Sequence, residues 1–254
     1  MSVIRSVLSA FLMYSRIPVP RVEWKEENRR YALCFFPLIG AAVGALILLW
    51  LWICEQLDLG DMLFAVGCAV IPIAVTGGIH LDGYCDVSDA MSSCADRERK
   101  LEIMKDSHIG AFAAIKLALY LLMQTALFSE LRDILPLMTA AVCFVQSRAW
   151  SGLAAVTMKN ARGSGSLQSF TEPAHRKITV ASEVLWICIS SVLMLLTDNV
   201  SGTAAAVGGG LFFLYYRHFS AKNFGGITGD TEGWFVEMYE LITLGIIVLI
   251  NSLY

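Results

Sequence analysis

Seven apolar segments divide this chain of 254 residues, and their lengths limit the folds it can adopt. A helix needs roughly 20 apolar residues to cross the hydrocarbon core of a bilayer. Only helices and closed barrels satisfy every backbone hydrogen bond there. The segments lie at residues 33–53, 62–78, 112–128, 135–157, 178–196, 202–219 and 235–253. We therefore expect an all-α, polytopic membrane bundle of about seven transmembrane helices, forming a single integral-membrane catalytic domain over residues 1–254.

The composition agrees with a membrane protein. Hydrophobic residues make up 56% of the chain and charged residues only 16%, whereas soluble domains average about 25% charged residues. No basic run is interleaved with aromatic residues, which excludes nucleic acid as an expected partner. The seven cysteines are scattered and odd in number, which argues against a disulfide framework. The short segment 3–13 contains Arg5 and predicts an interfacial or re-entrant helix instead of a cleaved signal peptide.

Basic residues are confined to alternate loops. The opposite loops hold only Arg132. By the positive-inside rule, the basic loops face the cytoplasm, the N-terminus lies inside and Tyr254 lies outside. We predict a multi-pass protein of the cell membrane whose polar motifs face the cytoplasm. The basic residues are Arg21, Lys25, Arg29, Arg30, Arg97, Arg99, Lys100, Lys105, Lys159, Arg162, Arg176, Lys177, Arg217 and Lys222.

Three aspartates follow the second apolar segment at helical spacing. Asp82, Asp86 and Asp89 stand at positions i, i+4 and i+7, which places their carboxylates on one face of a helix. Such carboxylates repel one another unless a cation lies among them, and Mg²⁺ prefers oxygen ligands. A solvated acidic helix end is the alternative, but ionisable residues beside hydrocarbon are usually functional. We predict that the three aspartates are catalytic and bind Mg²⁺, with His80 as a nearby donor or base.

Two further polar segments lie at the same predicted face of the membrane. Lys105, Asp106 and Ser107 precede the third span, where they are expected to contact phosphate or the metal site. A short helix lying on the membrane, or simply a solvated surface helix, is the alternative. Gly226 and Thr228 belong to a glycine-rich turn, whose backbone N–H groups can approach an anion closely. A plain glycine turn before a capped helix explains them equally well.

Charged residues also occur within the last spans or at their start. Asp230 follows the glycine turn and is a fourth candidate catalytic carboxylate. Arg148 interrupts an apolar run, so it should face the bundle interior and pair with either a carboxylate or a substrate phosphate. Glu237 and Glu240 lie near the start of the last span and should avoid lipid. Arg148 and Glu237 are therefore predicted to bind substrate, although a structural ion pair remains an alternative for Arg148.

The order of these motifs resembles that of the cobalamin synthase family, the adenosylcobinamide-GDP ribazoletransferases. Matching motifs run across nearly the whole chain. They are Ser15-Arg16-Ile17-Pro18-Val19-Pro20, Phe36-Pro37-Leu38-Ile39-Gly40, residues 77–89, residues 101–110, Ser147-Arg148 and residues 225–237. The chain departs from the family pattern at Ala90, where glycine is usual, at His108, where arginine is usual, and at residues 232–234. No departure removes a carboxylate.

The resemblance implies a late step in the assembly of the cobalamin nucleotide loop. Members of such a family join adenosylcobinamide-GDP to α-ribazole or its 5′-phosphate, and they release GMP. Mg²⁺ is the implied cofactor, and the corrinoid, the ribazole and the lipid bilayer are the implied partners. The sequence leaves a homo-oligomer open.

Two other functions fit some of the residues. A CDP-alcohol phosphotransferase of phospholipid synthesis also uses aspartates at a membrane boundary, and Asp82-Gly83 matches the start of its motif. The Ala-Arg that should follow is absent, and the second aspartate comes only four residues later. A cation transporter would line its path with acids such as Glu237 and Glu240. Here the acids gather at one face of the membrane and do not cross it.

Overall fold

The computed structural model describes residues 3–23, 25–163 and 165–253, which are helical apart from their connecting loops and one isolated β-bridge. The elements, in chain order, are α1 (Val3–Tyr14), α2 (Glu26–Arg29), the 3₁₀ helix η1 (Leu33–Phe35), α3 (Pro37–Gln56), α4 (Asp61–Thr76), α5 (Ile79–Ser92), α6 (Arg97–Ile103), α7 (Ala111–Ser129), α8 (Ile134–Thr157), α9 (Ser166–Thr171), α10 (Arg176–Thr197), α11 (Asn199–Phe224) and α12 (Gly229–Asn251). The predicted all-α class is confirmed.

Each of the seven predicted spans coincides with a long helix, but the count of seven is not confirmed. Within the described residues, α3, α7, α10 and α12 are long and apolar enough to cross a membrane. The pair α4 and α5 adds a fifth candidate, bent by 96° at its break. The helices α8 and α11 are long enough but not apolar enough to count as candidate spans. Polar residues interrupt α8 at positions 146–148, and α11 ends in a polar stretch that includes Arg217 and Lys222.

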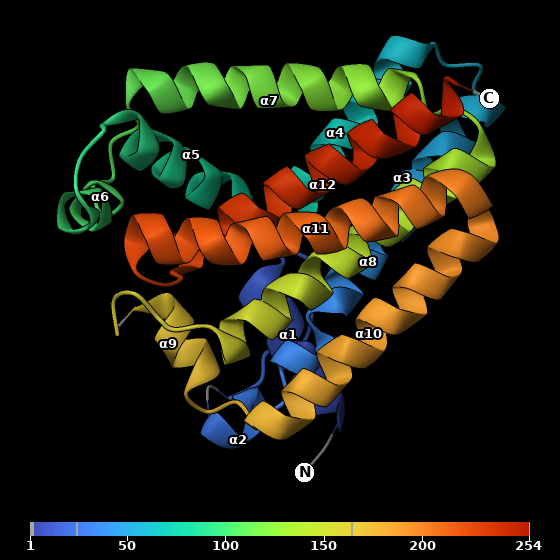
Figure 1. Cartoon of the computed structure of the whole chain (residues 1–254). Helices are drawn as coiled ribbons and strands as arrows, with labels where there is room; N and C mark the ends of the chain where they lie inside the picture. The colour runs from blue at the N-terminus through green and yellow to red at the C-terminus, as the bar shows by residue number, and fades with distance from the viewer. Residues whose placement is uncertain (1–2, 24, 164, 254) are drawn as a thin grey trace.

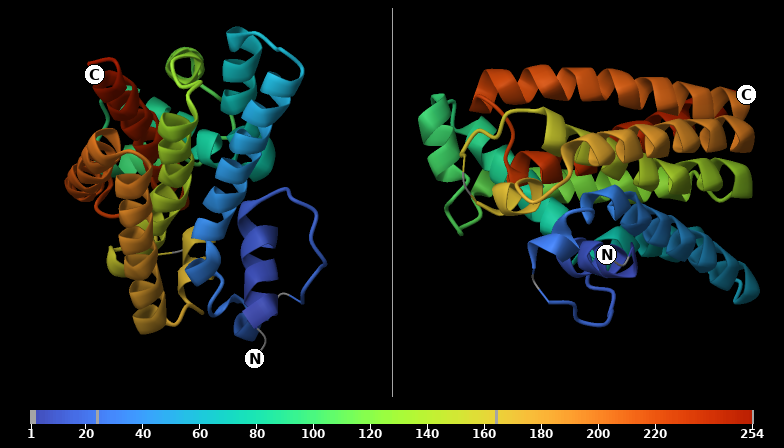
Figure 2. Two further views of the ribbon diagram at one scale, coloured as in Figure 1. Left: turned by 90° about the vertical axis from the view of Figure 1, so that its right-hand side faces the viewer. Right: turned by 90° about the horizontal axis from the view of Figure 1, so that it is seen from below.

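The helix α8 is the central element of the bundle. It packs against α3 on one side and α10 on the other, and it also contacts α11 and α12. The helix α12 packs in turn against α5 and α11 (Figure 1). The N-terminal α1 lies to one side, against η1 and the start of α3 (Figure 2). The core therefore forms around α8 and α12, and α1 is added at its edge.

A glycine pair produces the sharp turn between α4 and α5. Gly77 and Gly78 have φ angles of +69° and +79°, which residues with a side chain rarely adopt. Gly77 ends α4 in the left-handed conformation, and α5 begins directly after Gly78. Because the chain turns here, the acidic face of α5 does not continue the direction of α4. It lies at the end of the bundle.

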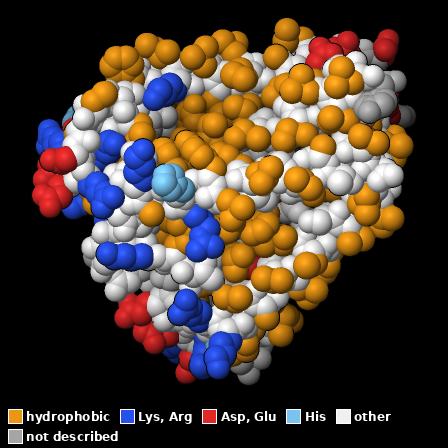
Figure 3. Space-filling model, viewed as in Figure 1, with side chains coloured by type: hydrophobic (Ala, Val, Ile, Leu, Met, Phe, Trp, Pro, Cys, Tyr) orange, Lys and Arg blue, Asp and Glu red, His pale blue; other side chains and the backbone are white. Residues whose placement is uncertain are grey.

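The loops that carry basic residues meet at one end of the molecule. The connections α5–α6 and α11–α12 lie at the left of Figure 1, whereas the C-terminus lies at the right. Lys and Arg side chains gather along the left and lower parts of the molecule in Figure 3, and hydrophobic side chains cover most of the remaining face. This separation agrees with the charge pattern of the loops.

The helices α5 and α12 approach so closely that their backbones touch. A β-carbon at Gly83 would lie 2.6 Å from the carbonyl oxygen of Asp230, and one at Gly233 would lie 2.9 Å from that of His80. Neither glycine can be replaced by a larger residue unless one helix moves. The register between α5 and α12 is therefore fixed by these two positions.

Replacing Gly83 by alanine should separate α5 from α12. The added methyl group meets rigid backbone, so we expect Gly83→Ala to lower the free energy of unfolding by about 1–3 kcal/mol. Thermal unfolding of the purified protein in detergent would measure the loss. Gly60→Ala is the control, since nothing lies within 4 Å of its β-carbon position. An unchanged unfolding midpoint for Gly83→Ala would contradict the close contact.

Candidate active site

Three carboxylates from two helices converge at the basic end of the bundle. Asp82 and Asp86 lie on the outward face of α5, and Asp230 lies in the first turn of α12. The contact at Gly83 brings the three within electrostatic reach of one another. In the described chain, no group donates a hydrogen bond to the carboxylate of Asp82 or Asp86. These two acids are therefore free to bind a ligand or a cation.

A tight turn places Asp230 at this site. Gly225 ends α11 with a φ of +76°, and Ile227 then pairs with the loop after α8 through its backbone N–H and carbonyl groups. Thr228 caps α12, since its hydroxyl accepts a hydrogen bond from the backbone N–H of Thr231. The Thr231 hydroxyl in turn accepts a hydrogen bond from the backbone N–H of Thr228. The alternative of a glycine turn before a capped helix is thus what the structure contains.

The predicted ligands Gly226 and Thr228 have structural contacts in this turn. A β-carbon at Gly226 would lie 2.2 Å from the carbonyl oxygen of Lys159. The Thr228 hydroxyl is used by the helix cap and also lies 3.5 Å from Asp230. Both residues shape the site, and their contacts explain their presence without a bound substrate.

Arg162 is a site residue that the sequence gave no reason to select from among the other basic residues. It forms an ion pair of 3.0 Å with Asp230. It also donates hydrogen bonds to the carbonyl oxygens of Leu101 and Met104. Arg162 therefore ties the loop after α8 to α6 and to the acidic site. Only its position after the pairing segment with Ile227 could have suggested this role, and that pairing is a tertiary feature.

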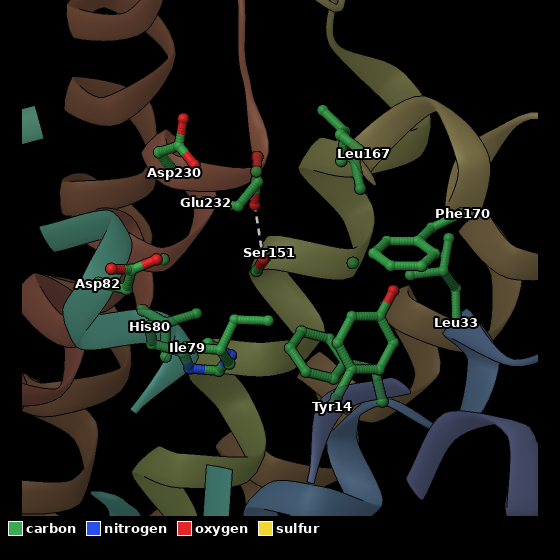
Figure 4. A pocket seen from close by; sticks show the side chains of 16 residues that line it. Tyr14, Leu33, Ile79, His80, Asp82, Ser151, Leu167, Phe170, Asp230 and Glu232 are labelled. Atoms are coloured by element: carbon green, nitrogen blue, oxygen red, sulfur yellow. Dashed lines mark hydrogen bonds between the residues drawn. The ribbon is translucent and has the colours of Figure 1, made fainter. Parts of the chain in front are cut away.

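A cavity of about 260 Å³ opens beside the acids. Figure 4 shows Asp82, Asp230 and Glu232 on one side and the rings of Tyr14 and Phe170 opposite. Its lining residues are Tyr14, Leu33, Phe36, Ile79, His80, Asp82, Ser151, Gly152, Ala155, Leu167, Phe170, Gly229, Asp230, Glu232, Gly233 and Val236. Six elements, α1, η1, α5, α8, α9 and α12, thus contribute to one pocket.

Three buried polar side chains, His80, Ser151 and Glu232, line this cavity. Glu232 accepts hydrogen bonds of 2.5 Å from Ser151 and 2.9 Å from Tyr216, and only 7% of the residue is exposed. His80 is 6% exposed, and within the described chain its Nδ1 atom has no hydrogen-bond partner. The structure therefore places the predicted His80 at the cavity wall, and it adds Glu232 and Ser151, which the sequence analysis did not select.

Asp89 differs from Asp82 and Asp86 because its carboxylate accepts hydrogen bonds from the protein. Its two carboxylate oxygens accept hydrogen bonds from the backbone N–H groups of Gly110, at 2.6 Å, and Ala113, at 3.0 Å. These donors form the N-terminal turn of α7, where a negative charge is favourable. Asp89 thus holds the start of α7 against α5.

The other predicted site residues lie apart from the cavity. Lys105, Asp106 and Ser107 are exposed in the loop before α7. The His108 ring, 2.7 Å from Asp106, holds the pKa of that carboxyl below its usual range. The helix α6, which precedes this loop, packs against α5 and α11. The helix α6 is therefore held by contacts with two other helices of the protein.

Arg148 and Glu237 are buried in the bundle, as expected. Arg148 is 1% exposed and forms an ion pair with Glu240, which also accepts a hydrogen bond of 2.8 Å from Ser147. Glu237 accepts a hydrogen bond from Tyr120. Of the two partners considered for Arg148, the structure contains the carboxylate. Arg148 is not among the residues that line the cavity.

The fit of a metal ion depends on the substrate. Within the described residues, no group of three or more His, Cys, Asp and Glu side chains is arranged to hold a metal. Mg²⁺ is commonly bound by only one or two carboxylates, with phosphate oxygens and water as further ligands. The unpartnered oxygens of Asp82 and Asp86 are suitable donors for such an ion. The site therefore fits Mg²⁺ that arrives with a phosphate ligand.

Comparison with known proteins agrees with this geometry. The model of the cobalamin-5-phosphate synthase family matches residues 6–248. The chain belongs to this family. A relative from Lachnoclostridium phytofermentans named adenosylcobinamide-GDP ribazoletransferase is 42% identical over 97% of this chain and 94% of its own. Proteins of the same name from Clostridium perfringens strain 13 and Listeria monocytogenes are 33% and 30% identical over 92% and 98% of this chain, and over 95% and 99% of their own.

No solved structure matches the chain. The family match agrees with the resemblance noted from the motifs, and it sets aside the CDP-alcohol phosphotransferase and the transporter. The matched range 6–248 covers most of α1 and nearly all of α12. All the residues that line the cavity therefore lie within the range that matches the family.

We expect the two neighbouring aspartates Asp89 and Asp82 to respond differently to amidation. Asp89→Asn replaces a charged acceptor of two backbone N–H groups and should lower the free energy of unfolding by about 1–3 kcal/mol. Asp82→Asn is the matched control and should leave stability unchanged, because Asp82 is exposed and accepts no hydrogen bond within the described chain. Thermal unfolding in detergent distinguishes them. Equal midpoints would show that Asp89 does not cap α7.

Proposed function

We propose that the acidic site of α5 and α12 is where this protein joins a corrinoid donor to a ribazole acceptor. As a member of its family, the protein is a transferase of cobalamin synthesis, an adenosylcobinamide-GDP ribazoletransferase like its relatives. The observation that carries the assignment of the site is the pair of unpartnered carboxylates, Asp82 and Asp86, beside Asp230 and the cavity.

The reaction replaces the phosphoanhydride bond of the diphosphate with a phosphate ester bond. A hydroxyl oxygen of the acceptor attacks the phosphorus atom that is bound to the cobinamide. The bond from that phosphorus to the bridging oxygen breaks, and GMP leaves with the electron pair. The hydroxyl proton passes to a carboxylate. Asp230 is best placed to accept it, because it lines the cavity and Arg162 holds one of its oxygens in position.

Charge on the diphosphate must be offset while the bond breaks. Mg²⁺, held by Asp82 and Asp86, would supply this electrostatic stabilisation when bound. Arg162 lies at the site itself, and it can contact a phosphate oxygen while it is paired with Asp230. Lys105 lies in the exposed loop before α7 and remains a candidate for contacting the donor. Arg148, by contrast, serves to neutralise Glu240 inside the bundle.

The membrane topology supports a site that opens to the cytoplasm. We propose that the seven long helices cross the cell membrane, with α8 and α11 shielded in part by their neighbours. The end that carries the acidic site is also the end that carries the basic loops, which normally stay in the cytoplasm. Soluble, charged substrates such as nucleotides would then reach the site directly.

Asp86→Asn should abolish catalysis without unfolding the protein. The change removes a negative charge but keeps the shape of the side chain, so we expect Mg²⁺-dependent release of GMP from adenosylcobinamide-GDP to fall by about 100-fold or more. Asp58→Asn, at the opposite end of the bundle, is the control and should retain full activity. Normal turnover by Asp86→Asn would refute the assignment of the site.

Cys94 provides a test of the sidedness. It is an exposed, free cysteine in the loop between α5 and α6. In a Cys188→Ala background, a membrane-impermeant maleimide should label Cys94 in inside-out vesicles but not in intact cells. An added cysteine at Asp58, at the other end, should show the reverse pattern. Labelling of Cys94 from outside the cell would invert the proposed orientation.

A further inference from the structure

The cavity beside the acids has two chemically different halves. One half carries His80, Asp82, Ser151, Asp230 and Glu232. The other half is apolar and rich in aromatic rings, as Figure 4 shows around Tyr14 and Phe170. The wall of the second half consists of Tyr14, Leu33, Phe36, Leu167 and Phe170. A ligand that fills the cavity must therefore be apolar at one end and polar at the other.

The aromatic half is a wall of rings that contact one another, and a flat ring can pack on the side of this wall that faces the cavity. Tyr14 lies 4.4 Å from Phe36 and 5.5 Å from Phe170 between ring centroids. Phe36 in turn lies 6.0 Å from the ring of His80. Aromatic groups at such distances pack favourably through their edges and faces. Phe170 comes from α9, a short helix in the loop after α8, so it covers the cavity from the loop side.

The cavity volume decides which reactant can enter. Pockets that enclose a whole drug-sized ligand measure ~300–1,000 Å³, whereas this one measures about 260 Å³. A corrinoid macrocycle is far larger, and a guanosine diphosphate carries charges that the aromatic wall cannot satisfy. The base of α-ribazole is a flat, largely apolar bicycle attached to a polar ribose. It matches both the size and the polarity of the cavity.

We propose that the aromatic half of this cavity binds the base of the acceptor nucleoside, with its ribose directed toward Asp82 and Asp230. The proposal rests on the proposed function, since it takes the acidic site as the place of reaction. The depth of the cavity then sets which base the enzyme accepts. The donor approaches from the open, charged side, where its phosphate meets the ribose hydroxyl beside Asp230.

Two polar atoms near the aromatic half are available to the base. The Nδ1 atom of His80 has no partner among the described residues, although the side chain is buried. Tyr14 points its hydroxyl toward the space beneath Phe170 (Figure 4). Burial, together with the nearby Glu183 and Glu232, raises the pKa of the Tyr14 phenol, so the hydroxyl keeps its proton and can donate. Either group can bind the one ring nitrogen of the base that lacks a substituent.

Filling the cavity tests the proposal. Ala155 lies on its wall, and Ala155→Leu should raise the KM for α-ribazole by about tenfold or more, because added methylene groups occupy the space of the base. The KM for adenosylcobinamide-GDP should stay within about twofold. Ala221→Leu, on the exposed face of α11, is the matched control and should change neither value.

A second variant enlarges the cavity instead of filling it. Phe170→Ala removes one ring of the aromatic wall without adding bulk, so it should weaken α-ribazole binding and improve the use of an acceptor with a tricyclic base relative to α-ribazole. Isothermal titration of α-ribazole with each folded variant, without the donor present, measures binding apart from turnover. Together, the two variants separate loss of the subsite from misfolding.

The outcomes distinguish this inference from the proposed function. Weaker binding of α-ribazole in both variants, with donor KM preserved, supports the subsite. If wild-type protein releases GMP but both variants bind α-ribazole normally, the base lies elsewhere and only the inference fails. If wild-type protein binds α-ribazole but Asp86→Asn turns over normally, the proposed acidic site fails while the cavity assignment stands. Equal loss of affinity for both substrates would also overturn the subsite.

Discussion

Gly83 and Gly233 allow the backbones of α5 and α12 to touch, and the acidic site exists because they do. Asp82 and Asp86 come from one helix and Asp230 from the other, more than 140 residues later in the chain. A side chain at either glycine would separate the helices and the carboxylates with them. The turn at Gly77 and Gly78 has the complementary effect, because it directs α5 across the end of the bundle. Four glycines thus set the geometry of the site.

Two acids inside the bundle have polar partners, whereas Asp82 and Asp86 at the site accept no hydrogen bond within the described chain. Arg148 pairs with Glu240, and Glu237 accepts a hydrogen bond from Tyr120. A charge within a bilayer is costly unless it is paired, so these two contacts favour the packing of the helices. Asp82 is exposed and Asp86 is partly exposed, so water can solvate both carboxylates without a protein partner.

The cavity depends on elements that contribute little to the bundle core. Its aromatic half is completed by Tyr14 from α1 and by Phe170 from α9, which both lie outside the central helices. The acidic wall therefore comes from the core helices, and part of the aromatic wall comes from elements at the edge of the bundle.

The sequence by itself determined the helical class, the positions of the long helices, the sorting of basic loops and the family. These follow from local properties: apolar length, charge pattern and ordered motifs. It also selected Asp82, Asp86, Asp89 and Asp230 as candidate site residues at one face of the membrane. The tertiary structure alone decided the rest. Asp89 caps α7, Arg148 pairs with Glu240 and Arg162 pairs with Asp230. The fold also brings Tyr14, Phe36 and Phe170 around one cavity. Helical spacing predicts which side chains share a face, but the partner across that face depends on how distant helices pack.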